Sequence, residues 1–178
     1  RWIVTAVTPK EVSVSTQQEL LNALSGSSAT IITAASNITL DGNATIPSFM
    51  KLVITQGVTL NITGESVLTA TGTIENNGRI NVSGNGFISK IENVSGTGSF
   101  NMPGVSSGVY TVSTPMQLQY LSVLLAADNM SGISTIVLAN DISMPEGSVF
   151  STLGEHENLT FDGQGHTISG LRITSISG

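Results

Sequence analysis

The sequence predicts an all-β protein built as a parallel β-helix, a solenoid of about 20 residues per coil with short capping α-helices. Similar five-residue motifs recur at that interval: LNITG begins at Leu60, INVSG at Ile80 and FNMPG at Phe100. Within each motif apolar and polar residues alternate, which is the pattern of a strand with one buried face. The motifs are separated by residues that favour bends, namely Gly, Asn, Ser and Thr.

A short helix is expected before the strands, at about residues 16–24. Thr16 is followed three residues later by Glu19, which is the spacing of a capping box, and three leucines follow at helical spacing. We expect this helix to close one end of the stack and to shield its apolar edge from water.

Rows of twenty residues that begin at Ile31 bring apolar residues into register. Two columns are apolar in every row, namely Ala34, Ile54, Ile74 and Val94, and Leu40, Leu60, Ile80 and Phe100. A third column contains Ile62, Val82 and Met102 and is interrupted by Gly42. Because a short strand cannot bury its apolar face alone, we expect like residues of successive coils to stack about 4.8 Å apart.

A polar column follows the second apolar one and consists of Asp41, Asn61, Asn81 and Asn101. The residue type favours a structural interpretation, because stacked amides can hydrogen-bond from one strand to the next. The alternative is an exposed ladder that binds a ligand. Asn61, Asn81 and Asn101 are therefore candidate binding residues.

The order of a helix followed by strands returns in the second half of the chain. Thr114 precedes Pro115, and Gln117 stands where Glu19 stands in the first helix, which predicts a second capping helix at about residues 114–127. The words NITLDG and NLTFDG, which follow the two helices, complete the parallel.

The chain is therefore expected to contain two β-helix modules, residues 1–104 and 105–178. The pattern leaves open whether they stack into one rod or meet at a flexible joint. Because the sequence stops while apolar and polar residues still alternate, the second module is expected to be truncated. We expect a monomer whose open last coil frays after Leu171 or pairs end to end with another molecule. The apolar residues of that coil are Phe161, Ile168, Leu171 and Ile173.

Composition excludes several classes of protein. Only 10% of the residues are charged, against about 25% in an average soluble domain, and such weakly charged polar surfaces are common outside cells. Six Lys and Arg residues and a net charge of −6 leave no basic stripe for nucleic acid. No apolar run approaches the roughly 20 residues of a membrane span. The absence of cysteine excludes a disulfide framework and thiolate metal sites.

The motifs together resemble a known family. A helix that begins at VST, then I-x-L-x-x-D-I, then FDGQGHTISGL is similar to the right-handed parallel β-helix, or pectin-lyase-like, class. In particular, it resembles bacterial surface proteins in which such a segment leads into GLUG-type repeats. The resemblance spans Val14 to Leu171 and implies an exported, often multi-domain surface protein. Its family includes adhesins and polysaccharide-active enzymes.

The catalytic groups of that class are not visible in the sequence. The resemblance would require an Arg or Lys base beside calcium-binding carboxylates, or a cluster of Asp residues. The aspartates here are isolated, so no catalytic or metal-ligating residue and no cofactor is predicted. A calcium ion bound by scattered outward carboxylates is left open as an alternative, although no spacing supports it. In DGQGH, Asp162 can bond its own turn and His166 is interpreted as a turn or surface residue. Both are kept as candidate binding residues.

These observations predict a non-catalytic module of the bacterial cell surface or extracellular space that serves in adhesion, glycan binding or scaffolding. The expected partner is a polysaccharide or a cell-surface glycan. The alternative is a polysaccharide lyase or glycoside hydrolase of the pectin-lyase-like class. Aromatic residues make up only 4% of the chain, with Trp2, Tyr110 and Tyr120 as the candidates for sugar stacking, so glycan binding would have to be polar.

Overall fold

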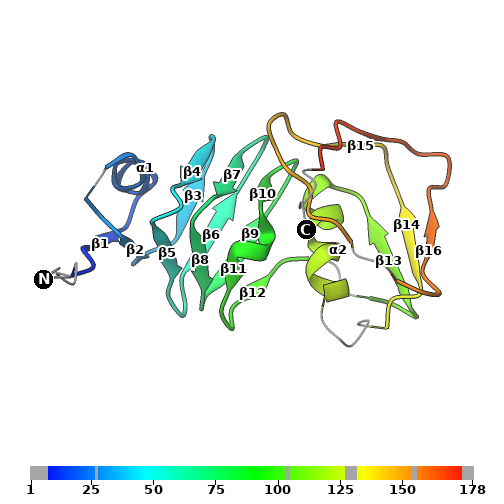
Figure 1. Ribbon diagram of the computed structural model, residues 1–178, viewed down its shortest axis with the longest axis horizontal. Helices are drawn as coiled ribbons and strands as arrows, with labels where there is room; N and C mark the ends of the chain where they lie inside the picture. Colours follow the sequence, from blue (N-terminus) through cyan, green and yellow to red (C-terminus); the bar gives the residue numbers. More distant parts are fainter. Residues whose placement is uncertain (1–7, 27, 103–104, 127–131, 154–155, 174–178) are drawn as a thin grey trace, which may run out of the picture.

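The structure is a computed structural model of the 178-residue chain, and it describes residues 8–26, 28–102, 105–126, 132–153 and 156–173. In these residues short β-strands predominate, with two α-helices and one 3-10 turn (Figure 1). Every pairing between the named strands is parallel. The predicted class, mainly β with parallel strands and short helices, is confirmed.

Three sheets form the first part of the chain. The first sheet contains β1 (Glu11–Val14), β2 (Ile31–Ala34), β5 (Lys51–Ile54), β8 (Thr73–Asn76) and β11 (Val94–Ser95). The second contains β3 (Ile38–Leu40), β6 (Thr59–Ile62), β9 (Arg79–Val82) and β12 (Ser99–Phe100), and the third β4 (Ala44–Ile46), β7 (Val67–Ala70) and β10 (Phe87–Ser89). From β2 onward the chain visits the sheets in turn, and we call one such visit to all three a passage.

The step between paired residues is not a constant 20. Ala34 pairs with Ile54, 20 residues later, but Leu40 pairs with Ile62, 22 residues later. The step from β4 to β7 is 24, and the steps from β6 to β9 and from β7 to β10 return to 20. The column that placed Leu40 beside Leu60 is therefore wrong at its first member. The column of Ala34, Ile54, Ile74 and Val94 is wrong between its second and third members, because Ile74 pairs with Leu52 and Ile54 pairs with Asn76.

Ile38 stands in that place instead, beside Leu60, while Leu40 precedes Ile62 in the neighbouring column. The added residues lie in the corners between strands, and they come in twos. Because side chains on a strand alternate with a period of two, an even insertion leaves every apolar face pointing inward. Ile38, Leu40 and Leu60 are all buried.

A second group of strands follows the second helix. One sheet contains β13 (Val109–Val112), β14 (Thr135–Leu138) and β16 (Thr160–Asp162), and β15 (Ile142–Ser143) pairs with β17 (Ile168–Ser169). The helix α2 (Pro115–Ala126) lies between the two groups (Figure 1). It packs against β13 on one side and against β10 and the 3-10 turn η1 (Ile91–Asn93) on the other.

One cluster of buried side chains includes residues of both groups, for example Ile88, Met116 and Ile136. The backbone N–H of Ile88 lies 3.3 Å from the sulfur of Met116. Pro103 and Gly104, where the module boundary is predicted, lie outside the described residues.

The first helix, α1 (Gln17–Ser25), begins with the predicted capping box. The Thr16 hydroxyl accepts a hydrogen bond from the Glu19 N–H at 3.2 Å, and the Glu19 carboxylate accepts one from the Ser15 N–H at 2.7 Å. The side chain of Glu19 thus reaches the residue before the cap. These bonds satisfy backbone donors that a helix start leaves free.

A capping box of the same kind begins α2, and its contribution to stability can be tested by mutation. The Thr114 hydroxyl accepts from the Gln117 N–H at 3.3 Å, and the Gln117 side chain accepts from the Ser113 N–H at 2.7 Å. We expect Thr114→Ala to lower the free energy of unfolding by about 1 kcal/mol, because the Gln117 N–H loses its acceptor. Urea unfolding measures this. Thr114→Ser keeps the hydroxyl and should stay near the parent protein; equal losses in the two variants would contradict the capping role.

Exposed apolar side chains lie on and after the last described strands. Phe161, Leu171 and Ile173 are 46%, 43% and 52% exposed, while Ile168 is half-buried. β16 and β17 each form an edge of their sheets within the described residues. Residues 174–178, for which fraying or pairing is predicted, lie outside the described part.

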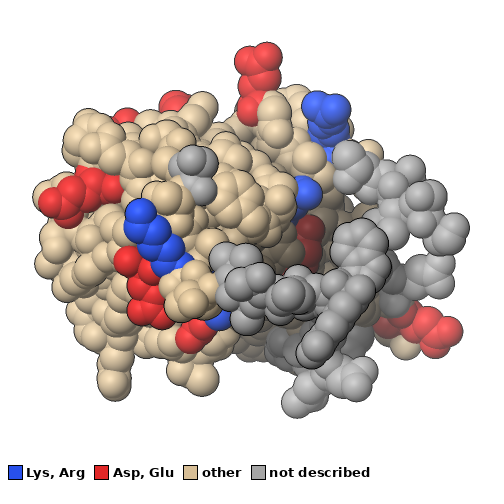
Figure 2. All heavy atoms as spheres, turned by 60° about the vertical axis from the view of Figure 1, so that its left-hand side comes forward, with Lys and Arg blue, Asp and Glu red and all other residues tan. Residues whose placement is uncertain are grey.

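The surface is weakly charged, in agreement with the composition. On the face drawn in Figure 2, acidic and basic side chains are scattered among a large majority of other residues. Of the helices in the described part, none is both long enough and apolar enough to cross a membrane.

Candidate functional site

A polar groove follows one corner of the first group of strands, where the second sheet leads into the third. One hollow of about 390 Å³ is lined by Asp41, Gly42, Asn43, Thr63, Gly64, Glu65 and Ser66. A hollow of about 510 Å³ shares Glu65 with it and adds Asn85, the turn from Ser143 to Ser148, Gly170 and Arg172. A third, of about 290 Å³, shares Asn43 with the first and Glu146 with the second. Because the hollows share residues, we treat them as one feature, the corner groove.

Local sequence explains both walls of the corner groove. On the first wall the words TGES and SGNG turn the chain, and Gly64 and Gly84 adopt positive φ angles of 62° and 64° that favour glycine. The opposite wall is the turn after β15, where both the N–H and the hydroxyl of Ser148 donate to the Pro145 carbonyl, at 3.1 Å and 2.6 Å. The groove therefore lies between two segments that are distant in sequence.

Amide side chains hold two carboxylates of the corner groove. Asn85 donates from its side-chain amide to one oxygen of Glu65 at 2.8 Å. Gln17 donates to Asp41 at 3.0 Å and accepts from the Asp41 N–H at 3.2 Å. Each of these carboxylates has a second oxygen for which no hydrogen bond is seen within the described residues. Such an oxygen can accept a hydrogen bond from a ligand.

Ser66 is a buried polar residue of the corner groove. The residue as a whole is only 4% exposed, but its hydroxyl is not among the buried side-chain atoms that lack a partner in the described part of the chain. Charge on the groove is unbalanced, because it has the carboxylates of Asp41, Glu65 and Glu146 and the single cation of Arg172.

The asparagine column is hydrogen-bonded between passages, as the structural interpretation predicted. Asn81 donates to Asn61 at 3.0 Å, and Asn61 donates to the Thr39 hydroxyl at 3.4 Å. Thr39 holds the place that was predicted for Asp41, because of the two-residue insertion. Asn101 instead bonds the backbone of Val82, accepting from its N–H at 2.6 Å and donating to its carbonyl at 2.9 Å. None of these three asparagines is among the residues that line the corner groove.

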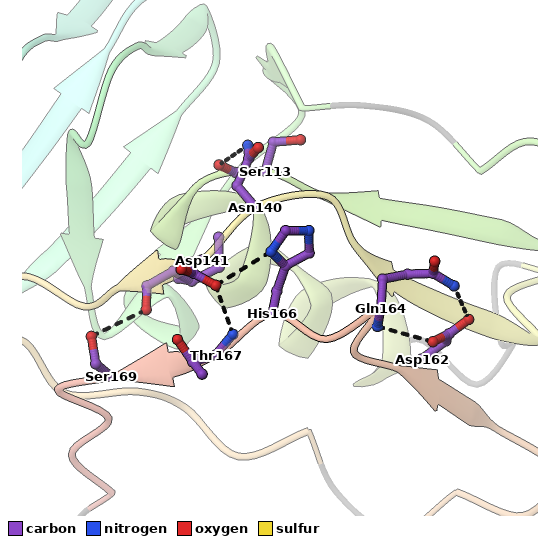
Figure 3. A network of polar contacts seen from close by, with 9 residues as sticks. Ser113, Asn140, Asp141, Asp162, Gln164, His166, Thr167 and Ser169 are labelled. Carbon is purple, nitrogen blue, oxygen red and sulfur yellow. Dashed lines mark hydrogen bonds and ion pairs between the residues drawn. The ribbon is translucent and has the colours of Figure 1, made fainter.

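Asp162 and His166 lie in a second polar network, shown in Figure 3. Asp162 accepts from the Gln164 N–H at 3.0 Å and from the Gln164 side-chain amide, so it bonds its own turn as predicted. His166 is on the surface, and its Nδ1 lies 3.3 Å from a carboxylate oxygen of Asp141. The same oxygen accepts from the Thr167 N–H at 2.9 Å. The sequence alone indicates no partner for Asp141, whereas in the structure its carboxylate lies against the His166 ring.

These bonds should make the Asp141 contact sensitive to acid. The hydrogen bond from the Thr167 backbone, followed by that from the His166 side chain, lowers the pKa of Asp141 below its ordinary value. A lowered folded pKa means that the contact contributes stability above the ordinary pKa of about 4 and loses it as pH falls through the folded pKa.

The Thr167 amide chemical shift, followed by NMR from pH 6 to pH 2, should therefore change with an inflection below about pH 4. Asp141→Asn, whose side-chain oxygen can still accept the bond, should show no such inflection. A Thr167 signal in the parent protein that does not change over this range would contradict the contact.

Of the candidate aromatic side chains in the described residues, Tyr110 is buried and Tyr120 is half-buried. Tyr110 is buried, donates its hydroxyl to the Gln117 carbonyl at 3.2 Å, and has its pKa raised by that burial. The Tyr120 ring packs on Phe100 with centroids 5.2 Å apart. Trp2 lies outside the described residues.

Metal ligands are not clustered in the part of the chain that the structure describes: no three His, Cys, Asp or Glu side chains are placed to hold an ion. His156, which the sequence places between two glutamates, instead contacts the Leu153 carbonyl at 2.6 Å through Nε2.

Comparison of the chain with protein-family models, with curated proteins and with solved structures finds no significant match in any of the three.

Proposed function

We propose that this chain is a right-handed parallel β-helix module of an exported bacterial surface protein and that it binds a glycan without cleaving it. The solenoid form is supported by the way the chain visits three parallel sheets in turn, with steps of 20 to 24 residues. The sequence resemblance to pectin-lyase-like surface proteins supports the same class. A weakly charged surface without cysteine fits a bacterial exterior.

The observation that carries the binding function is the corner groove. It is elongated, it crosses successive passages, and its walls present carboxylates, amides and hydroxyls. Ligand sites are concave surfaces with a few convergent polar groups that fix orientation. A glycan, which is rich in hydroxyl groups, is the ligand class that such a lining suits.

One observation favours the alternative, a glycoside hydrolase. Glu65 and Glu146 line the same hollow, and glycosidases of most families use a pair of carboxylates as acid and base or nucleophile. Against this, Asn85 holds Glu65 in a hydrogen bond and a structural role explains its position. In the described residues no three carboxylates are placed together to hold the calcium ion that a lyase of this class would use.

Two assays on the purified chain separate these functions. A glycan array measures binding, and incubation with pectins, alginates, glycosaminoglycans and neutral polysaccharides is followed for new reducing ends and unsaturated products. The proposal expects retention of at least one glycan and no products. Products that disappear in Glu65→Gln would establish the hydrolase instead, and an array without any bound glycan would contradict the binding function.

A further inference from the structure

We infer that residues 144–151, which we call the strap, open as a unit while the strands of the first group stay folded, and that this opening uncovers an apolar strip on the outer face of the third sheet. The strap follows β15 and runs from the second group of strands back toward the first (Figure 1). The strands that it covers, the way it is attached and the apolar surface that it buries support this inference.

The third sheet has apolar side chains on its outer face. In β4, Thr45 is exposed between two buried residues, so Thr45 faces outward. Thr45 pairs with Thr69. Val67 lies two residues before Thr69 and therefore also faces outward, and it pairs with Phe87. Even so, Val67 and Phe87 are only 7% and 0% exposed, so another segment must cover this face.

Two observations place the strap over that outer face. The Val149 N–H lies 3.4 Å from the hydroxyl oxygen of Ser89, which pairs with Thr69 and so faces outward as well. Glu146 and Gly147, at the tip of the strap, line one hollow together with residues of the same face. Without the strap, the apolar strip that includes Val67 would be in contact with water.

The strap is attached to its neighbours by side chains and not by a strand ladder. It contains no helix or strand, and no hydrogen bond between backbone groups joins it to the first group within the described residues. Instead, the Ser151 hydroxyl donates to the Glu92 carboxylate at 2.6 Å and accepts from the Gln119 side-chain amide at 2.9 Å. The Gln119 side-chain oxygen accepts from the Ser151 N–H at 3.3 Å. We call these three contacts the latch.

Burial of apolar side chains favours the closed strap. Met144 and Phe150 belong to the buried cluster and are 5% and 7% exposed. On the other side of the strap, the Phe150 N–H donates to the Arg172 carbonyl at 2.9 Å. Opening breaks this bond and the latch, but it breaks no strand pairing of the first group. A segment held by so few contacts opens at a lower free energy than the whole molecule.

Opening of the strap also changes the corner groove. The tip of the strap forms the second wall of the groove, so opening removes that wall. The latch residues Glu92, Gln119 and Ser151 are not among those that line the groove, and they position its wall from a distance. Because opening does not depend on which ligand the groove binds, failure of the proposed glycan binding would leave this inference standing.

Thiol labelling of the full chain tests the opening, since the chain has no cysteine of its own. Val67→Cys places a thiol under the strap, Leu68→Cys places the neighbouring one in the core, and Thr45→Cys places one at an exposed position of the outer face. Iodoacetamide should label Thr45→Cys at the rate of a free thiol, and Leu68→Cys no faster than global unfolding allows. Val67→Cys should be labelled at an intermediate rate, at least about tenfold faster than its own global stability in urea predicts.

A latch variant tests what holds the strap closed. Ser151→Ala should raise the labelling rate of Val67→Cys by about tenfold, because it removes the hydroxyl that bonds a carboxylate and an amide. Labelling of Leu68→Cys should change only as far as global stability changes. Ser13→Ala makes the same substitution on β1, in another sheet, and should alter neither rate. Circular dichroism confirms that each variant is folded.

Three outcomes would overturn the inference. If Val67→Cys is labelled no faster than its global unfolding allows, the strap opens only when the whole molecule unfolds. If it is labelled as fast as Thr45→Cys, the strap does not cover this face. If Ser151→Ala leaves the labelling rate of Val67→Cys unchanged, the contacts of Ser151 do not hold the strap closed, and the latch on which its opening depends is wrong.

Discussion

Replacing Ile80 with Asp should unfold the first group of strands. Ile80 lies in β9 with no exposed surface, and it stacks between Leu60 and Phe100 in the second sheet. An unpaired carboxylate in such a place costs several kcal/mol, which is a large share of the roughly 5–15 kcal/mol that holds a domain folded. Thermal and urea unfolding, followed by circular dichroism, should show loss of the cooperative transition or a large fall in its midpoint.

Arg79→Asp is the matched control for Ile80→Asp. Arg79 immediately precedes Ile80 in β9, but it is exposed, so a carboxylate there stays in water. Its effect should lie within about 0.5 kcal/mol of the parent protein. Near-parental stability of Ile80→Asp would mean that this column faces outward and that the described stacking is wrong.

Gly72→Ala should be nearly as damaging, although it adds a single methyl group. An added Cβ would lie 2.2 Å from the Pro47 carbonyl oxygen and 2.3 Å from that of Met50. These are backbone atoms of the preceding corner, which is two residues longer than the corner that contains Gly72. Only a residue without a side chain lets the short corner sit against the long one. We expect a loss of about 3 kcal/mol in the free energy of unfolding.

Gly42→Ala provides the comparison in urea unfolding. An added Cβ at Gly42 meets no atom within 4 Å, and its φ angle is not in the positive range. Alanine there should be neutral or slightly stabilising, because it reduces the freedom of the unfolded chain. Equal losses at the two glycines would show that close packing of the corners is not what Gly72 provides.

Local features of this fold were predictable from the sequence because their signals lie within a few residues. Both capping boxes connect residues three or four positions apart, and both helices begin at the predicted threonines. Alternation within a strand is equally local. It identified buried residues such as Leu60 and Ile80 without knowledge of their partners.

Register was less predictable, because it depends on how many residues each corner holds. Rows of a fixed twenty residues hide the insertions in the corners. Because each insertion adds an even number of residues, the columns of the layout still contain apolar residues after a strand has been displaced by two positions. Thus Leu40 was placed beside Leu60, and Asp41 beside Asn61. The signal that could have shown the displacement is the turn sequence TQG, which lengthens the corner before β6.

The candidate site depends on that register and on contacts between residues that are still farther apart in the sequence. The contact between Asp141 and His166 joins residues 25 positions apart. The corner groove joins Glu65 with a turn near Glu146 that belongs to the second group of strands. No local pattern marks such a pair, although the recurring turns TGES and SGNG mark one wall.

The parallel stacking of successive passages is the central claim, and disulfide trapping tests it most directly because the chain has no cysteine of its own. In the structure Thr39 pairs with Asn61 across β3 and β6. Paired strands lie about 4.8 Å apart, within the range of Cα separations that a disulfide bridges.

Thr39→Cys combined with Asn61→Cys should form an intramolecular disulfide rapidly under mild oxidation, as seen by mass spectrometry of tryptic peptides. Asp41→Cys with Asn61→Cys, which a constant 20-residue repeat would pair, is displaced by two residues along the strand and should stay reduced. Efficient crosslinking of the second pair, with none of the first, would contradict the described register and the stacking built on it.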